Sequence, residues 1–175
     1  MKKIFFLSLV LFLSIASEAQ KFAYIDTEYI LSKVPEYQEA QKQLDALSEQ
    51  WQKQVEKRYE AIEKMYKDLQ AEEILLTESM KNKRQEEIIK KEQEARDFQK
   101  KKFGIDGELF KKRKELIKPI QEKIYKAVQE TANVGKYSVI FDKASDATMV
   151  YSNPKYDKSD DILRRMGIKP EGNSK

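Results

Sequence analysis

Residues 36–70 read EYQEAQKQLDALSEQWQKQVEKRYEAIEKMYKDLQ, and this stretch decides the fold. Its apolar residues recur at every third or fourth position: Tyr37, Ala40, Leu44, Leu47, Trp51, Val55, Tyr59, Ile62, Tyr66 and Leu69. The mean step is about 3.56 residues, between the period of a coiled coil and that of a free helix. The pattern predicts a long helix with one narrow apolar seam. Pro35 suits its first turn, where a missing N–H costs nothing.

A second seam follows later in the chain. It repeats by seven at Phe110, Ile117, Ile124 and Thr131, joined by Ile120, Ala127 and Val134. Between the two seams, residues 81–102 hold nine basic and five acidic residues around a few apolar positions. This composition has strong helix propensity but little to bury, so we expect a soft helix there.

The chain can turn back at either of two places between these seams. One is residues 74–77, where Thr77 would cap the next helix, and the other is residues 103–107, which contain two glycines. A turn at the first place leaves two helical arms of similar length, so we favour it. We place the tip of a helical hairpin at about residues 73–79 and the hairpin at residues 36–134. The glycine segment then becomes a kink or bulge in the returning helix, and Pro119 a second local distortion.

The two ends of the chain predict a small sheet. Residues 22–25, 137–141 and 148–151 are apolar and β-branched or aromatic, with a turn at residues 142–146. A short helix should run from Ser159 to Met166, with acidic residues in its first turn and Gly167 after its end. The predicted fold class is therefore α+β: a small β-sheet body formed by both ends, residues 20–35 and 136–175, plus a long α-helical coiled-coil hairpin.

Residues 1–19 have the form of a secretory signal peptide. Lys2 and Lys3 precede an apolar run over residues 4–16. Small residues stand three positions and one position before an expected cleavage site between Ala19 and Gln20. The run is shorter than the roughly 20 residues of a transmembrane helix. An uncleaved anchor is the alternative. Because the chain has no Cys, neither a lipid at the cut nor a disulfide is available, and the bacterial periplasm is the expected compartment.

The composition argues against several functions. Without residues 1–19 the chain keeps 32 basic and 29 acidic residues, a net charge of +3 that is mild for a nucleic-acid-binding protein. There is no His and no Cys, so an imidazole base, a thiol nucleophile and a zinc site on those ligands are excluded. We expect no enzyme, no cofactor, no metal and no nucleic-acid partner.

A monomer is also not expected. A sheet and two short helices comprise about 50 residues, near the size at which a core is marginal without disulfides, metal or association. Self-association is the remaining way to stabilise such a body. The candidate residues of the oligomerisation region are Phe22, Tyr24, Ile25, Val139, Ile140, Phe141 and Val150.

These features together match one family pattern. The exported chain opens with a strand at residues 21–26 and a short helix at residues 27–31, continues as a charged helical hairpin, and closes with residues 137–143, 150–153 and the capped helix. It resembles the Skp/OmpH family of periplasmic chaperones, particularly the form found in Bacteroidetes-type bacteria. The resemblance covers essentially all of the mature chain, and its most specific parts are the two ends.

The resemblance implies a fold and a function. Family members are homotrimers with a central β-body and three projecting hairpins, or tentacles, which enclose a cavity. The cavity holds unfolded outer-membrane proteins without nucleotide, as an ATP-independent holdase. The interrupted segment at residues 103–107 and Pro119 depart from the pattern. A membrane surface or lipopolysaccharide is a further partner that the sequence leaves open.

A holdase needs a wide, weakly apolar and adaptable surface. The candidate client-binding residues are Ile74, Leu75, Leu76, Met80, Ile88, Ile89, Phe98 and Phe103. The seven basic and two acidic residues of segment 111–126 would attract acidic clients. The alternatives are a structural coiled-coil scaffold, which would not need the small body, and a lipid- or surface-binding protein of the cell envelope, whose binding should weaken with salt.

Overall fold

The computed structural model describes residues 20–145 and 149–170. The expected signal peptide, residues 1–19, lies outside the described residues. The described chain divides into two compact units. We call Val34–Lys123 the hairpin unit, and the described parts of Met1–Lys33 and Ile124–Lys175 the body unit.

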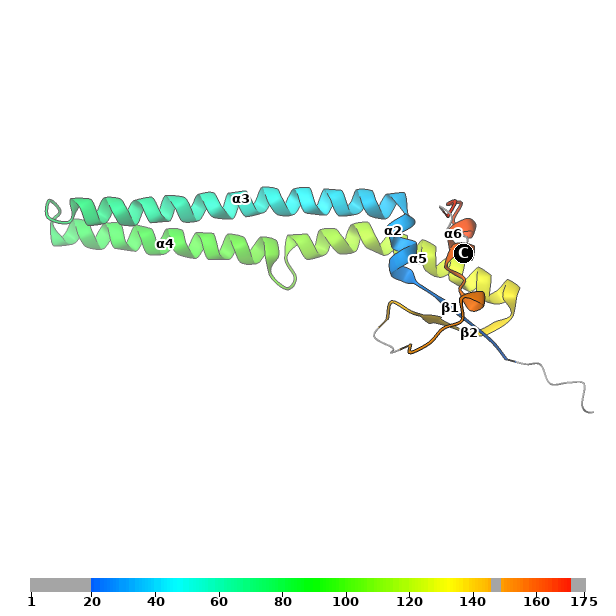
Figure 1. The fold of residues 1–175 in the computed structure, drawn as a ribbon. Helices are drawn as coiled ribbons and strands as arrows, with labels where there is room; N and C mark the ends of the chain where they lie inside the picture. Colours follow the sequence, from blue (N-terminus) through cyan, green and yellow to red (C-terminus); the bar gives the residue numbers. More distant parts are fainter. Residues whose placement is uncertain (1–19, 146–148, 171–175) are drawn as a thin grey trace, which may run out of the picture. The chain divides into compact units, whose positions relative to one another are not determined.

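The hairpin unit is built from two long helices that lie side by side (Figure 1). Helix α3 spans Pro35–Glu72, 38 residues that begin at the predicted proline, and helix α4 spans Glu78–Phe103. Thr77 caps α4 as the sequence predicts, because its hydroxyl accepts a hydrogen bond from the Met80 N–H at 3.3 Å. Residues 73–77 make the turn between the two helices.

A narrow core joins α3 to α4. Ile62 of α3 and Ile88 and Ala95 of α4 are buried together, and Met65 and Leu69 pack against them. Tyr66 adds a cross-helix hydrogen bond from its hydroxyl to a Glu92 carboxylate oxygen at 2.9 Å. Because α4 has few apolar positions, two of its residues are buried and the rest of the helix is largely exposed.

Helix α5 spans Glu108–Gly135 and follows α4 after a real break. We expected a kink or bulge at the glycine segment, and this was wrong: α4 ends at Phe103 and residues 104–107 form a loop, visible as a small excursion in Figure 1. The Gly107 N–H closes the loop on the Gly104 carbonyl at 2.8 Å. A Cβ on Gly104 would come within 2.4 Å of the Lys100 carbonyl oxygen, so this backbone path requires glycine. Pro119, where we expect a local distortion, lies inside α5, which stays helical through that residue.

The body unit contains a two-stranded parallel sheet. Strand β1 (Lys21–Ile25) pairs with β2 (Tyr137–Asp142), with Phe22 opposite Val139 and Ile25 opposite Asp142. Parallel strands cannot be joined by a tight turn and need a long crossover, which the helices between them supply. Both chain ends therefore meet in one sheet, as the sequence predicts.

The third strand expected at residues 148–151 is not formed. Thr148 lies outside the described residues, and Met149, Val150 and Tyr151 have no strand structure. The prediction failed because a strand needs a backbone partner, whereas an apolar run only shows that a segment could be buried. The second edge of β1 instead makes a single bridge between Tyr24 and Asp157.

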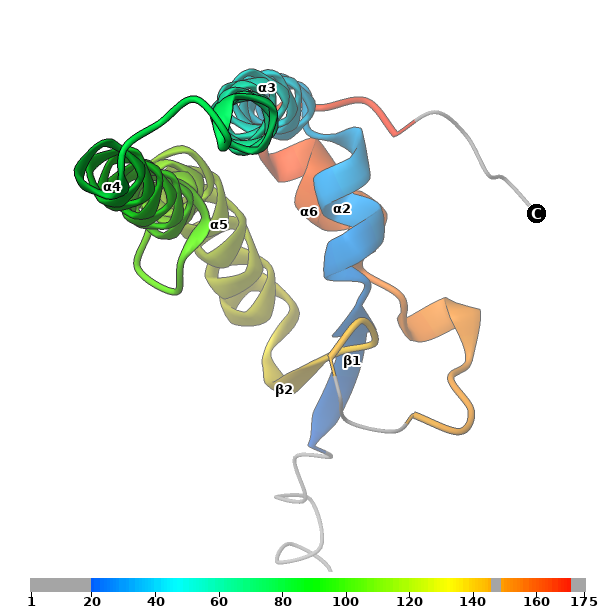
Figure 2. The same ribbon diagram turned by 90° about the vertical axis from the view of Figure 1, so that its left-hand side faces the viewer.

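Two short helices belong to the body unit and pack against each other. Helix α2 spans Thr27–Lys33 and α6 spans Ser159–Arg165, and they lie against each other (Figure 2). Ile30 of α2 and Ile162 and Leu163 of α6 are completely buried. A short 3-10 turn, η2 (Pro154–Tyr156), precedes α6. Gly167 follows α6 with a φ of 78°, the left-handed conformation that ends many helices.

The adjacent residues Ile88 and Ile89 provide a matched test of the hairpin core. Ile88 is 2% exposed and Ile89 is 59% exposed. Ile88→Ala should lower the free energy of unfolding of the hairpin by about 2–4 kcal/mol, because it removes buried methyl groups and leaves a cavity. Ile89→Ala should change it by less than about 0.5 kcal/mol. Urea titration followed by far-UV circular dichroism measures both, and equal losses would contradict this core.

Candidate functional site

The turn of the hairpin unit presents apolar side chains to solvent. Ile74 is 97% exposed and Leu75 is 83% exposed, whereas Leu76 is half-buried. Met80, in the first turn of α4, is 51% exposed. A turn has no second helix to cover it, and adjacent exposed aliphatic residues at such a place indicate a contact surface more than a core.

The other candidate client-binding residues lie along α4 in different environments. Ile89 is exposed, Phe98 and Phe103 are half-buried, and Ile88 is buried in the core between α3 and α4. Ile88 therefore offers no surface in this structure. The exposed set is Ile74, Leu75, Met80 and Ile89.

Phe98 and Phe103 belong to a cluster of aromatic and cationic side chains. Arg58 lies 4.3 Å from the Phe98 ring centroid, and Lys102 lies 4.5 Å from that of Trp51. The Trp51 and Phe103 rings meet edge to face at 6.3 Å. Such contacts contribute roughly 0.5–2 kcal/mol each. The cations of this cluster were not predicted from the sequence. The spacing of Phe98 and Lys102, four residues apart on one helix face, was the available signal.

The predicted oligomerisation residues are partly exposed. Tyr24 and Ile25 are buried and Ile140 is half-buried, but Phe22, Val139, Phe141 and Val150 are exposed by 47%, 41%, 47% and 93%. The Phe22 and Phe141 rings stack at 6.4 Å across the two strands. They line a groove of about 1000 Å³ with Met149, Tyr151 and Tyr156.

Polar side chains tie the strands of the body to its helices. The Asp142 carboxylate at the end of β2 accepts hydrogen bonds from the Thr27 N–H at 3.1 Å and the Thr27 hydroxyl at 2.6 Å. The Ser159 hydroxyl accepts one from the Asp26 N–H at 2.9 Å, and the Tyr29 hydroxyl donates to Asp160 at 3.0 Å. The beginning of α2 is thus held by both β2 and α6.

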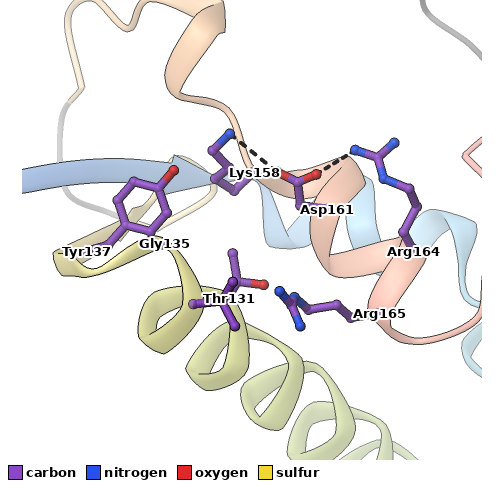
Figure 3. Close-up of a pocket in the computed structure, with 8 residues that line it drawn as sticks. Thr131, Gly135, Tyr137, Lys158, Asp161, Arg164 and Arg165 are labelled. Carbon is purple, nitrogen blue, oxygen red and sulfur yellow. Dashed lines mark hydrogen bonds and ion pairs between the residues drawn. The ribbon is translucent and has the colours of Figure 1, made fainter.

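A second, smaller pocket lies where α5, β2 and α6 meet. Its volume is about 390 Å³ and its lining includes Lys158, Asp161, Arg164 and Arg165 (Figure 3). The Asp161 carboxylate pairs with Arg164 at 2.5 Å and with Lys158 at 3.3 Å.

Both partners of the Lys158–Asp161 ion pair are charged at neutral pH. Burial alone would raise the pKa of Asp161, but hydrogen bonds from Arg164 and Lys158 outweigh it and lower that pKa below its usual value. Burial alone would lower the pKa of Lys158, but its bond to Asp161 leaves that pKa raised.

Neither a metal centre nor a membrane span is found in the described part of the chain. Across residues 20–145 and 149–170, no three Asp, Glu, His or Cys side chains gather where they could hold a metal ion. Within those same residues, no helix combines the length and the apolar character needed to cross a bilayer.

Comparison with known proteins agrees with the β-body and hairpin. Residues 21–166 match the family model described as outer membrane protein (OmpH-like). The chain belongs to the OmpH-like family. A solved structure from Caulobacter crescentus, described as a candidate OmpH-like outer membrane chaperone, superposes with a TM-score of 0.68 at 12% identity, covering 86% of each chain. An uncharacterized protein from Aquifex aeolicus is 29% identical over 166 residues, which is 95% of this chain and 96% of that protein.

The family match covers both ends of the sheet and the whole hairpin unit of this OmpH-like protein. It confirms the resemblance drawn from the sequence. The structural neighbour shows that the fold is shared.

The contacts of Asp142 generate a stability prediction for the body. Asp142→Ala should lower the free energy of unfolding by about 1–3 kcal/mol, because it leaves the Thr27 N–H and hydroxyl without their acceptor. Glu28→Ala, at an exposed position of the same helix, is the matched control and should cost less than about 1 kcal/mol. Thermal unfolding of the OmpH-like protein measures both, and an unaffected Asp142 variant would contradict the role of this carboxylate.

Proposed function

We propose that this OmpH-like protein is an ATP-independent periplasmic holdase that binds unfolded outer-membrane proteins and prevents their aggregation. It would act after export, with the signal peptide removed near Ala19 and Gln20. The observation that carries the proposal is the exposed apolar turn of the hairpin, where Ile74 and Leu75 are almost fully in solvent. Membership of the OmpH-like family and the likeness to a structure described as an OmpH-like outer membrane chaperone support a role of this surface in client binding.

The rest of the hairpin unit supports weak and adaptable binding. Helix α4 buries few of its residues, and Ile89 and Met80 stay exposed along it. Methionine adapts to irregular partners, and each exposed aliphatic side chain contributes a small contact area. Many such contacts would hold an unfolded chain without selecting one sequence. The basic surface of α5 would add long-range attraction for acidic clients.

We also propose that the protein works as a homotrimer joined through the body. The support is physical: a two-stranded sheet is too small to be stable alone, and Phe22, Val139, Phe141 and Val150 leave apolar surface uncovered. Copies that bury this surface against one another would enlarge the core. Three hairpins brought together in this way would enclose a space for the client.

Suppression of aggregation tests the client surface. An unfolded outer-membrane barrel diluted from urea should stay soluble when the mature protein is present and precipitate without it, as light scattering records. In the double variant Ile74→Ser, Leu75→Ser, the concentration needed for half suppression should rise at least about threefold, because the most exposed apolar contacts are lost. Gln70→Ser, also exposed near the end of α3, is the control and should act like the unchanged protein.

A failure of the unchanged protein to hold the barrel would reject the holdase function. It would favour a coiled-coil scaffold, or a lipid-binding protein if the chain instead bound anionic vesicles in a salt-sensitive way.

Light scattering of the mature protein tests the trimer. The expected mass is three times that of the mature chain. The double variant Phe22→Ser, Phe141→Ser should lower the mean mass at micromolar concentration, because it makes the apolar groove of the body polar. Tyr125→Ser, at a 65% exposed position of α5, should leave the mass unchanged. A monomer that remains folded would contradict the proposed assembly.

A further inference from the structure

The pocket between α5, β2 and α6 carries more positive than negative charge. Its lining contains three cationic side chains, Lys158, Arg164 and Arg165, and one carboxylate, Asp161. Asp161 is shared between Lys158 and Arg164 (Figure 3). Among the described residues, Arg165 forms an ion pair with Glu130, which lies outside the lining. The distance between the guanidinium nitrogen and the carboxylate oxygen is 3.9 Å, longer than a charge-assisted hydrogen bond.

The end of α5 does not balance this charge completely. Helix α5 ends at Gly135, and its last carbonyls carry the partial negative charge of a helix C-terminus. Because α5 has no basic residue in its last turn, this partial charge attracts cations from outside the helix. That attraction corresponds to roughly half of an elementary charge. Counting Asp161 and Glu130 against the three cations leaves one positive charge, which is more than the helix end compensates. A small anion is therefore the ligand that this pocket favours.

The Tyr137 ring forms another side of the pocket. The Tyr137 ring lies against the Gly135 backbone, and a Cβ on Gly135 would come within 2.1 Å of a ring carbon. The residue with a left-handed backbone at the end of α5 is Lys136, with a φ of 51°, and not Gly135. The backbone freedom of glycine therefore does not explain why position 135 is a glycine. Gly135 is thus required for the position of the Tyr137 ring. Val134, which is 73% exposed, also lines the pocket.

We propose that this pocket binds the terminal carboxylate of an extended polypeptide, with Arg165 contacting the carboxylate and Tyr137 and Val134 contacting the last side chain. Guanidinium groups match the two oxygens of a carboxylate, and the neighbouring Arg164 already contacts a carboxylate oxygen, that of Asp161. The volume of about 390 Å³ suits the end of a chain rather than a large ligand. The inference rests on the proposed function: every unfolded client has one such end, and its capture would add a fixed point to many weak contacts.

Two peptides that differ in one group test the site. A labelled six-residue peptide ending in leucine would be prepared as the free acid and as the C-terminal amide, and its binding to the mature protein measured by fluorescence anisotropy. The free acid should bind about tenfold more tightly, because hydrogen bonds to an ionised group are lost in the amide. This advantage should shrink as salt is raised.

Three variants assign the effect to the pocket. Arg165→Gln should remove most of the preference for the free acid, whereas Lys169→Gln, an exposed cation of the same unit outside the lining, should keep it. Gly135→Ala keeps every charge but displaces the Tyr137 ring. It should weaken a free acid ending in leucine more than one ending in serine.

The outcomes separate this site from the proposed function. Equal binding of acid and amide, or a preference that survives Arg165→Gln, overturns the carboxylate site even where aggregation of the barrel is still suppressed. Displacement of the peptide by inorganic phosphate at equal concentration would also overturn it and assign the pocket to phosphate groups. A free-acid preference lost in Arg165→Gln, in a protein that cannot hold the barrel, would keep the site and reject the holdase.

Discussion

The parallel pairing of the two chain ends is the constraint on which the rest of this structure depends. β1 and β2 belong to opposite ends of the described chain, and parallel strands require a crossover between them. Closing so long a loop costs entropy, but that cost grows only with the logarithm of its length. The long helices can therefore be accommodated between the strands. The hydrogen bonds of Thr27 to Asp142 then hold the start of α2 against the end of β2.

The hairpin unit follows from a different balance. A 38-residue helix such as α3 can bury only a narrow seam, and α4 supplies few apolar residues to cover it. Ile62, Ile88 and Ala95 meet in one core, while Tyr66 reaches Glu92 with its hydroxyl rather than burying its ring. Stability is thus concentrated at a few points, and the surfaces between them stay solvated. Such a surface would suit the proposed holdase function, because an unfolded client needs many weak contacts rather than one rigid pocket.

The body combines two surfaces with different chemistry. The groove lined by Phe22 and Phe141 is apolar and suits burial against another protein surface. The pocket lined by Arg164 and Arg165 is small and positive, and its carboxylate Asp161 is already engaged. Apolar area favours association without direction, whereas guanidinium groups select an ion of a given shape. Under the two proposals, one small unit would offer both an assembly surface and a specific ligand site.

By itself the sequence determined the long helix α3 and the residues at which several helices begin or end. The seam from Tyr37 to Leu69 predicted α3, Pro35 and Thr77 marked where helices begin, and Gly167 marked where α6 ends, because periodicity and capping act between neighbours in the chain. Tertiary structure alone decided which apolar segments became strands and which became surface. Met149–Tyr151 has strand composition but pairs with no strand, and Ile88 and Ile89 differ in burial although they are chemically identical. The pocket around Arg165 also depends on residues distant in sequence. Burial and pairing depend on what lies opposite a residue in space, and no local pattern records that.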